Sequence, residues 1–360
     1  MPNPKNGRKP RLVAAGFFAL DIVFGLDDPA PRFYVGGTSG NVSAGSAFFG
    51  WDVIPLARLG NDIAGEFVRG DLERWGVKPA HLGLTPVAAT PIVLEKIEVN
   101  KHGLPKHRFL WSCPDCSSYF PPFKAMLRTQ VQLVKDELDT PEVFFADRVS
   151  PSVVELARHF REKGSLIYFE PSAAGDPKLF SEMLQICHVL KYSAQRARSF
   201  SELLRQHAAH LEIETLGEDG LRFRTRRAFT NWHSLPAFEV KIKDTAGSGD
   251  WATVGLISSL FRGGKLGLKA NKQELISALE HAQAVAALNC RFEGARGGMY
   301  QLSRLKFKEL IETIEAGRPS VHRERKISLT RQISTSEVCP GCSPKGNLVQ
   351  PQDRAVALHD

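Results

Sequence analysis

The chain has 360 residues, of which 42% are hydrophobic and 24% charged, so it holds enough apolar material for one large domain or two smaller ones. It has no run of 18 or more uncharged apolar residues, which excludes a membrane span, and its first residues lack the apolar core of a secretory signal, so we expect a cytoplasmic protein. The formal net charge of +8 lies mostly at the ends, with +4 in residues 1–11 and +3 in residues 318–360, and the nearly neutral body argues against nucleic acid as a partner.

Residues 11–60 predict two buried strands with a helix between them. The runs RLVAAGF at 11–17 and DVIPLARLG at 52–60 are short, apolar and interrupted or closed by glycine, as buried strands often are. Between them, small residues recur at helical spacing after GGTSGN at 36–41, which is typical of a helix packed closely on a sheet. A second helix is predicted within 61–77, with an Asp near its start and a Gly near its end.

Residues 89–112 have a different pattern. Apolar and polar residues alternate on both sides of a KHGLPK turn, which predicts a β-hairpin with one face in contact with water. Beyond it, the β-rich runs EVFFAD, SLIYFE, HVLKYS and LEIETLG alternate with helical stretches. This alternation predicts an α/β fold with a mostly parallel sheet covered by helices on both faces.

The segment 238–250 is predicted to be a strand that leads into a glycine-rich turn, DTAGSGD, followed by the helix that begins WATVGL. Two further helices are predicted at 271–289 and 303–316. After residue 316 the sequence becomes polar and irregular, so we treat 317–360 as a separate tail.

The DTAGSGD turn has the features of an anion site with a base beside it. Gly247 and Gly249 permit backbone conformations that point successive N–H groups outward, and the helix that follows adds its positive end. A carboxylate at Asp250 would repel a bound phosphate, so it does not suit a loop that only binds. It suits a base that takes the proton of an attacking hydroxyl while the N–H groups hold the transferred phosphoryl group.

From the residues alone, other interpretations of this turn stay open. Asp250 could simply cap the helix, as Asp often does near a helix start. The turn also fits the dinucleotide pattern G-x-G-x-x-A, ending at Ala252, but that pattern requires an acidic residue after a second strand about twenty residues on. This chain has RGGKLGLKANKQEL there, with no strand pattern, and no GK[ST] of a Walker A loop follows the glycines.

Four of the six cysteines form two similar turns, CPDC at 113–116 and CPGC at 339–342. A reducing cytosol disfavours structural disulfides, so C-x-x-C pairs indicate metal or redox chemistry. Two such turns would supply four thiolates to one tetrahedral Zn²⁺, from Cys113, Cys116, Cys339 and Cys342. Because 222 residues separate the pairs, this site requires the tail to fold back, and inert thiols or a redox-active pair are the alternatives.

Several motifs, in the right order, resemble the ribokinase-like (PfkB) carbohydrate kinase family over about residues 11–315. DTAGSGD resembles the DTxGAGD signature, with Ser248 where Ala is usual, and GGTSGNVSAGSAFFG resembles the N-terminal GG-x-x-x-N-x-A segment. LARLGNDIAGEF resembles the block L-x-x-x-G-x-D-x-x-G. TLGEDG at 215–220 and FEGARGG at 292–298 resemble the strand and turn beside the nucleotide and the final Gly-Ala turn.

The resemblance implies a ribokinase-like three-layer α/β/α sandwich with a small β-lid. It also implies an enzyme that transfers the γ-phosphate of ATP to a hydroxyl of a sugar, nucleoside or related polyol. Mg²⁺ would accompany ATP. Asp250 would be the base, and Asp244 lies where some members build a monovalent-cation site. The other implied residues are Ala246, Gly247, Ser248 and Gly249 for the anion hole; Asp21, Gly36, Gly37 and Asn41 for the substrate; and Lys191, Ser193, Thr215, Gly217 and Gly220 for ATP. From chemistry alone, Asn41 could instead cap a helix and Asp21 could be a turn residue.

One family motif is altered. The N-x-x-E motif, which helps to organise magnesium and phosphates, falls within KYSAQRA at 191–197, where Ser193 and Arg196 replace the Asn and the Glu. Either Arg196 contacts phosphate itself, or magnesium is held in another way, or activity is reduced or lost. The alternative function is therefore a non-catalytic sensor of the same fold that binds a sugar or nucleotide and uses a metal-binding tail for interaction.

The predicted organisation is a basic extension (1–10), a kinase domain (11–316) and the tail (317–360) that carries CPGC. Residues 17–35 and 89–112 would form the lid that closes over substrate and excludes water. A zinc ion would tether the tail to this lid. The lid edge leaves open a homodimer formed by pairing between two subunits.

Overall fold

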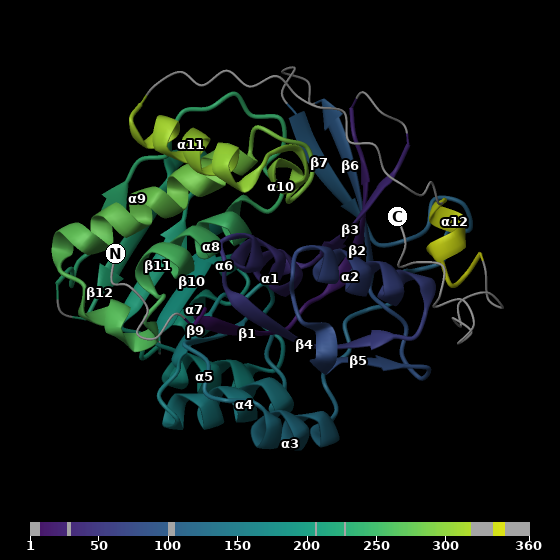
Figure 1. Cartoon of the computed structure of the whole chain (residues 1–360), viewed down its shortest axis with the longest axis horizontal. Coiled ribbons are helices and arrows are strands. Elements are labelled where there is room, and N and C mark those ends of the chain that lie inside the picture. Colours follow the sequence, from purple (N-terminus) through teal and green to yellow (C-terminus); the bar gives the residue numbers. More distant parts are fainter. Residues whose placement is uncertain are drawn as a thin grey trace.

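The computed structural model describes residues 8–26, 30–99, 105–205, 207–226, 228–317 and 334–342, whose arrangement is shown in Figure 1. A large sheet with helices on both faces forms the body, and a small sheet stands at one side of it. Most of the predicted extension and tail, and the centre of the turn predicted at 101–106, lie outside the described residues.

The main sheet is mostly parallel. Its strands, in spatial order, are β13 (His233–Leu235), β12 (Leu221–Thr225), β11 (Leu211–Thr215), β10 (Val189–Ser193), β9 (Leu166–Phe169), β8 (Val143–Ala146), β1 (Arg11–Ala15), β4 (Asp52–Gly60) and β5 (Leu82–Thr85). Neighbouring strands from β11 to β5 are parallel, and β12 and β13 extend one edge in antiparallel fashion. The carboxyl ends of the parallel strands therefore share one edge, where open α/β sheets bind ligands.

Two helical layers cover this sheet, because successive side chains of a strand point to opposite faces. In β1, Leu12 and Ala14 belong to one core, whereas Val13 and Ala15 belong to the other. The first core includes α1 (Thr38–Phe48), α2 (Ile63–Arg74), α8 (Ser248–Leu260), α9 (Lys272–Asn289) and α11 (Arg304–Glu315). The second includes α3 (Arg128–Glu137), α4 (Pro151–Glu162), α5 (Pro177–Ile186) and α7 (Ser201–Leu204), and α3 to α5 lie together at the bottom of Figure 1. The predicted three-layer arrangement is confirmed.

The small sheet has the order β3 (Arg32–Gly36), β2 (Ala19–Phe24), β6 (Ile92–Val99) and β7 (Pro105–Leu110). We call it the lid sheet. β6 and β7 form the antiparallel hairpin that the alternation predicts, and β2 pairs with β3 and, in parallel, with β6. Ile22 and Leu94 from neighbouring strands are buried in the first core. One face of the lid sheet is thus anchored to the body.

Short helical turns complete the described chain. They are η1 (Pro79–His81), α6 (Ala194–Ala197), η2 (Gly217–Asp219), η3 (Gly264–Lys269), α10 (Gly297–Gln301) and α12 (Thr335–Val338). The helices predicted at 271–289 and 303–316 correspond to α9 and α11.

The prediction of a strand at the start of 238–250 is wrong. Residues 236–246 belong to no strand. Phe238 and Val240 pack against the first core while Ile242 is exposed, so the apolar alternation comes from a chain that lies along the core. Without a neighbouring strand to complete its hydrogen bonds, such a segment cannot join a sheet.

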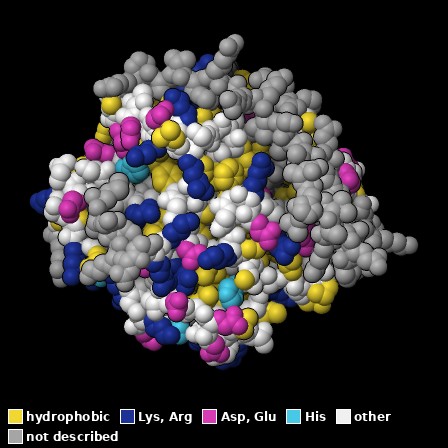
Figure 2. All heavy atoms as spheres, viewed as in Figure 1, with side chains coloured by type: hydrophobic (Ala, Val, Ile, Leu, Met, Phe, Trp, Pro, Cys, Tyr) yellow, Lys and Arg dark blue, Asp and Glu magenta, His cyan; other side chains and the backbone are white. Residues whose placement is uncertain are grey.

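The surface mixes charges of both signs. Figure 2 shows Lys and Arg side chains around the middle of the viewed face, with Asp and Glu side chains among them. This mixture agrees with the nearly neutral net charge of residues 12–317. Among the described helices, none combines the length and the apolar character that crossing a membrane requires.

Candidate active site

Asp250 lies in the first turn of α8, at the carboxyl edge of the main sheet. The helix begins after Gly247, whose φ of 69° favours glycine, and a Cβ there would lie 2.5 Å from the carbonyl oxygen of Ala295. The Asp250 side chain does not cap α8 but accepts a hydrogen bond from Asn41. The interpretation of Asp250 as a helix cap is therefore wrong.

The backbone N–H groups of the turn fall into two sets. Ala246 donates its N–H to Asp244 Oδ1 (2.9 Å), and Ser248 donates its N–H to the Thr245 carbonyl (3.2 Å). Within the described part of the chain, the N–H groups of Gly247, Gly249 and Asp250 have no protein acceptor. Since these groups belong to a helix start, they can receive an anion. The N–H groups of Ala246 and Ser248, both predicted to be part of the anion hole, are already used.

Asn41 links Asp250 to a buried arginine. It lies inside α1, which begins after Gly37, so Asn41 is not the N-cap that its chemistry allowed. Its Nδ2 donates to Asp250 Oδ2 (2.7 Å), and its Oδ1 accepts from Arg296 Nε (3.0 Å). Arg296 is buried and also donates to the Val35 carbonyl and to Asp71 Oδ2 (3.0 Å). The Asn41 amide is therefore held with its donor end toward the carboxylate.

Asp21 comes from the lid sheet and is a strand residue in β2, not the turn residue that was the alternative. A Cβ at Gly36, on the neighbouring strand, would collide with the Asp21 carboxylate, and a Cβ at Gly37 (φ 75°) would collide with the Phe17 carbonyl. Burial raises the pKa of Asp21 to about 7, with the Arg296 charge opposing and the Asp250 charge reinforcing the shift. The lid thus brings a second carboxyl within electrostatic reach of Asp250.

The pKa of Asp250 is raised to about 7. Burial is the largest cause and the nearby charge of Glu170 is the next, while the Asn41 hydrogen bond, Arg196 and Lys191 act in the opposite direction. A carboxylate poised near neutral pH is suited to taking a proton, because general bases work best when their pKa lies close to the working pH.

Lys191 connects two strands of the main sheet to the turn. It is a buried residue of β10, and its Nζ donates to the Gly249 carbonyl (3.0 Å) and pairs with the Glu170 carboxylate. Glu170 also accepts a hydrogen bond from Thr253 of α8. Lys191 therefore fixes the backbone of the turn and holds a positive charge beside it.

Two buried carboxylates were not among the predicted site residues. Glu170 directly follows β9, and Asp147 directly follows β8, where its Oδ1 accepts hydrogen bonds from the Phe17 N–H (2.8 Å) and the Ser39 hydroxyl (2.6 Å). Both close an apolar run at the carboxyl edge of the sheet. An acidic residue at the end of a buried strand was the signal that could have identified them.

The residues expected to contact ATP lie at the ends of β10 and β11. Ser193 is in register with Thr215, and its hydroxyl accepts the Arg196 N–H (3.3 Å) as the N-cap of α6. Arg196 is exposed, and its charge lowers the pKa of Asp250, so this charge lies within electrostatic reach of the site. Gly217 (φ 68°) borders open space, whereas a Cβ at Gly220 (φ 90°) would collide with the Leu235 carbonyl.

Asp244 occupies a second acidic centre between the turn and the lid sheet. Its Oδ2 accepts the Gly294 N–H (2.8 Å), and ligand atoms of Asp244, Glu95 and His107 lie within 4.8 Å of one another. Burial, followed by the Asp244 charge, raises the pKa of Glu95 well above its usual value. This donor set could hold a cation. The four predicted zinc ligands form a separate cluster, also within 4.8 Å of one another.

Comparison with known proteins gives one family and one fold. The model described as "pfkB family carbohydrate kinase" matches residues 26–301. A fructokinase from Xylella fastidiosa with bound ATP is 20% identical, with a TM-score of 0.65, and an aminoimidazole riboside kinase from Salmonella enterica is 20% identical, with a TM-score of 0.60. An Arabidopsis thaliana ribokinase with ribose and ATP is 14% identical, with a TM-score of 0.60; each comparison covers 85% of this chain and 99% of the other. The search of curated proteins found no match.

Proposed function

The chain belongs to the pfkB family of carbohydrate kinases, and from this premise we propose that it transfers the γ-phosphate of ATP to a hydroxyl of a sugar, nucleoside or related polyol. The observation that carries the proposal is the position of Asp250. It is a buried carboxylate with a pKa of about 7, in the same helical turn as backbone N–H groups that have no acceptor within the described residues. A base and an anion site so close together serve phosphoryl transfer and not simple phosphate binding.

In the proposed reaction, Asp250 accepts the proton of the acceptor hydroxyl. The hydroxyl oxygen forms a bond to the γ-phosphorus, the bond between that phosphorus and the β,γ-bridging oxygen breaks, and ADP leaves with the bonding electron pair. The N–H groups of Gly247 and Gly249 stabilise the charge on the transferred phosphoryl group. Asn41 aligns Asp250 through its 2.7 Å hydrogen bond.

Asp21, Gly36, Gly37 and Asn41 are proposed to bind the acceptor. Asp21 and Asn41 offer a carboxyl and an amide, which together bind neighbouring hydroxyls from two sides. Gly36 leaves room for the Asp21 carboxylate and Gly37 leaves room for the Phe17 carbonyl, since a Cβ at either position would collide with these groups. Similar solved structures contain bound fructose, ribose or aminoimidazole riboside, and so support sugars and nucleosides as the acceptor class.

ATP is proposed to lie along Lys191, Ser193, Thr215, Gly217 and Gly220, at the ends of β10 and β11 and in the turn η2. Mg²⁺ would neutralise the triphosphate charge. The altered motif offers it only the Ser193 hydroxyl, since Arg196 stands where the family has a carboxylate, so this pair does not fit the metal and no step above depends on it. A potassium ion in a similar fructokinase supports a monovalent cation near Asp244.

A screen of purified protein against sugars and nucleosides tests this function, with acceptor-dependent release of ADP as the readout. We expect at least one acceptor to stimulate ADP release in the unaltered protein and not in Asp250→Asn. The alternative, a non-catalytic sensor, is favoured by the charge reversal at Arg196. It would be supported if calorimetry detected binding of ATP or a sugar while no acceptor stimulated turnover.

A further inference from the structure

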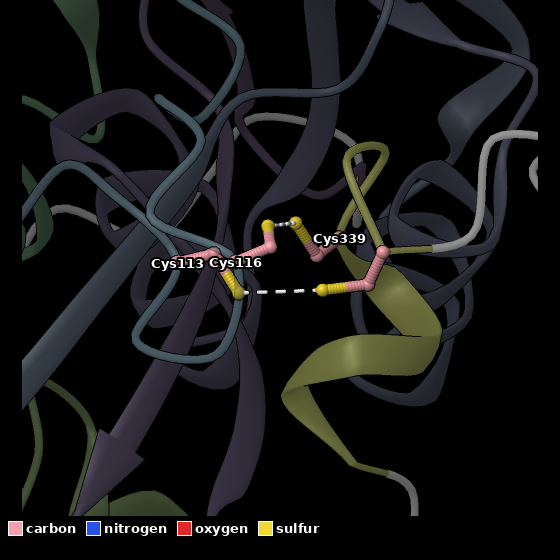
Figure 3. Close-up of side chains that lie close together, drawn as sticks. Cys113, Cys116 and Cys339 are labelled. Atoms are coloured by element: carbon pink, nitrogen blue, oxygen red, sulfur yellow. Dashed lines mark hydrogen bonds between the residues drawn. The ribbon is translucent and has the colours of Figure 1, made fainter.

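The two Cys-Pro-x-Cys turns face each other. Cys113 and Cys116 come from the loop that follows β7, and Cys339 and Cys342 come from the turn that follows α12. Figure 3 shows the side chains of Cys113 and Cys116 pointing toward that of Cys339 on the other segment. The four sulfur atoms lie within 4.8 Å of one another, with 3.7 Å between Cys113 and Cys342 and 3.7 Å between Cys116 and Cys339.

Each turn is folded by its own backbone. Ser117 N–H donates to the Cys113 carbonyl and Cys113 N–H to the Ser118 carbonyl, both at 2.9 Å, and Cys342 N–H donates to the Cys339 carbonyl at 3.1 Å. These hydrogen bonds hold the two thiols of each turn close together.

Gly341 shows that the turns are fitted to each other. A Cβ at this position would lie 2.5 Å from the Ser118 hydroxyl oxygen and 3.0 Å from Cys116 Sγ, so only glycine permits this approach. Cys113 and Cys339 are buried at the contact. Four thiols gathered by two preformed turns are the donor set of a closed structural metal site.

We propose that Cys113, Cys116, Cys339 and Cys342 bind one structural Zn²⁺. Tetrahedral zinc with Zn–S distances of about 2.3 Å separates its sulfur ligands by about 3.8 Å. The two measured separations of 3.7 Å agree with that spacing. Disulfide bonds would instead bring the paired sulfurs to about 2.05 Å. Four thiolates fill the coordination sphere, so the ion has no open position for catalysis.

The ion would fasten residues 334–342 to the base of the lid. α12 has four residues, too few to be stable without tertiary contacts, and it packs against α2 through a segment in which Thr335 and Val338 are buried. α2 carries Asp71, which accepts the Val35 N–H of β3 (2.8 Å) and pairs with Arg296. The cluster therefore joins the loop after β7 to the helix that supports β3.

Elemental analysis of protein purified without chelators tests the proposal. We expect about one Zn²⁺ per chain, and less than about a tenth of that in Cys116→Ser and Cys339→Ser. Cys187→Ser is the matched control, because Cys187 is a buried thiol at the end of α5 and should leave the zinc content unchanged. Zinc-free unaltered protein, or full zinc content in both cluster variants, would overturn the proposal.

Two further measurements use the unaltered protein, so they do not depend on whether the variants fold. Replacement of zinc by Co²⁺ in the unaltered protein should give the intense visible absorption of tetrahedral cobalt and the ultraviolet band of thiolate-to-cobalt charge transfer. Protein denatured without reductant should expose all six cysteines to a thiol reagent. Only two reactive thiols, as two disulfides would leave, or cobalt bound without thiolate bands, would contradict the zinc site.

Discussion

At the scale of single residues, the proposed chemistry depends on Asp250 and the groups that set its pKa. Asp250→Asn keeps the shape and removes the base, so kcat should fall about a hundredfold or more while the melting temperature changes little. Steady-state kinetics and a thermal melt measure both. Asp136→Asn, an exposed position on α3, is the matched control and should keep normal turnover. Near-normal turnover of Asp250→Asn would show that Asp250 is not the base.

The raised pKa of Asp250 predicts the pH dependence of the reaction. Because the base acts only when deprotonated, kcat/KM should fall as the pH drops through about 7, and not near 4 as for an ordinary Asp. The charge of Glu170 raises this pKa, so Glu170→Gln should move the acid limb to lower pH, while the amide still accepts from Lys191. A limb that stays in place or moves to higher pH would contradict the assignment.

Arg196 is predicted to contact phosphate in place of the family's Glu. Its charge lowers the pKa of Asp250 and therefore lies within electrostatic reach of the site. Arg196→Glu should raise the KM for ATP about tenfold or more and move the acid limb of the pH profile to higher pH, because an attractive charge becomes a repulsive one. Arg198→Glu, an exposed neighbour, serves as the control. Higher activity of Arg196→Glu would mean that the present residue reflects lost function.

At the scale of elements, the two glycines at the start of α8 have different tasks. Gly247 has a positive φ, and a Cβ there would approach Ala295, so Gly247→Ala should destabilise the fold by about 1–2 kcal/mol from backbone strain, with the steric clash in addition. At Gly249 the nearest atoms to an added Cβ are 3.7 Å away. Gly249→Ala should therefore keep the melting temperature. It should still raise the KM for ATP, because the added methyl group would stand beside the N–H groups of the proposed anion site. Equal effects of both changes on stability would contradict this division.

The elements that the sequence predicted are those with a strong local pattern. The hairpin β6–β7, the strand β4 and the helix α9 follow from alternation and helical spacing within each segment. The false strand after residue 237 had the same alternation, but whether a strand forms also depends on a neighbour that local pattern does not reveal. Elements were predictable where the pattern and the tertiary surroundings agree.

The site was predictable only in part, for a related reason. Asp250 and Asn41 belong to recognisable motifs. Arg296 also lies in one, FEGARGG, but its contact with Asn41 spans 255 positions of sequence and could not be read from the motif. Likewise Glu170 influences Asp250 only because β9 and α8 are adjacent in the fold. A local pattern can mark such residues as candidates, as the end of a buried strand does for Glu170, but it does not reveal which distant residue they contact.

At the scale of the whole molecule, the cysteine cluster is predicted to affect the lid. If zinc supports α2 and β3, Cys339→Ser should raise the KM for the acceptor, while kcat and the KM for ATP change little. The acceptor is proposed to bind to residues of the lid sheet, whereas ATP is proposed to bind at the carboxyl ends of β10 and β11. Cys187→Ser is again the control. An unchanged KM for the acceptor in zinc-depleted Cys339→Ser would show that the metal does not influence acceptor binding through the lid.

The network of Arg296, Asn41 and Asp250 also has a consequence for folding. Asn41 meets Asp250 across 209 positions, and Arg296 meets the Val35 carbonyl across 261. Contacts between such distant positions form slowly, because a long loop must close before they contribute any stability. During synthesis, the first two hundred residues can build most of the parallel sheet, yet they contain neither the base nor the arginine that aligns it. We therefore expect a nascent chain to remain inactive until the segment that carries Arg296 has left the ribosome.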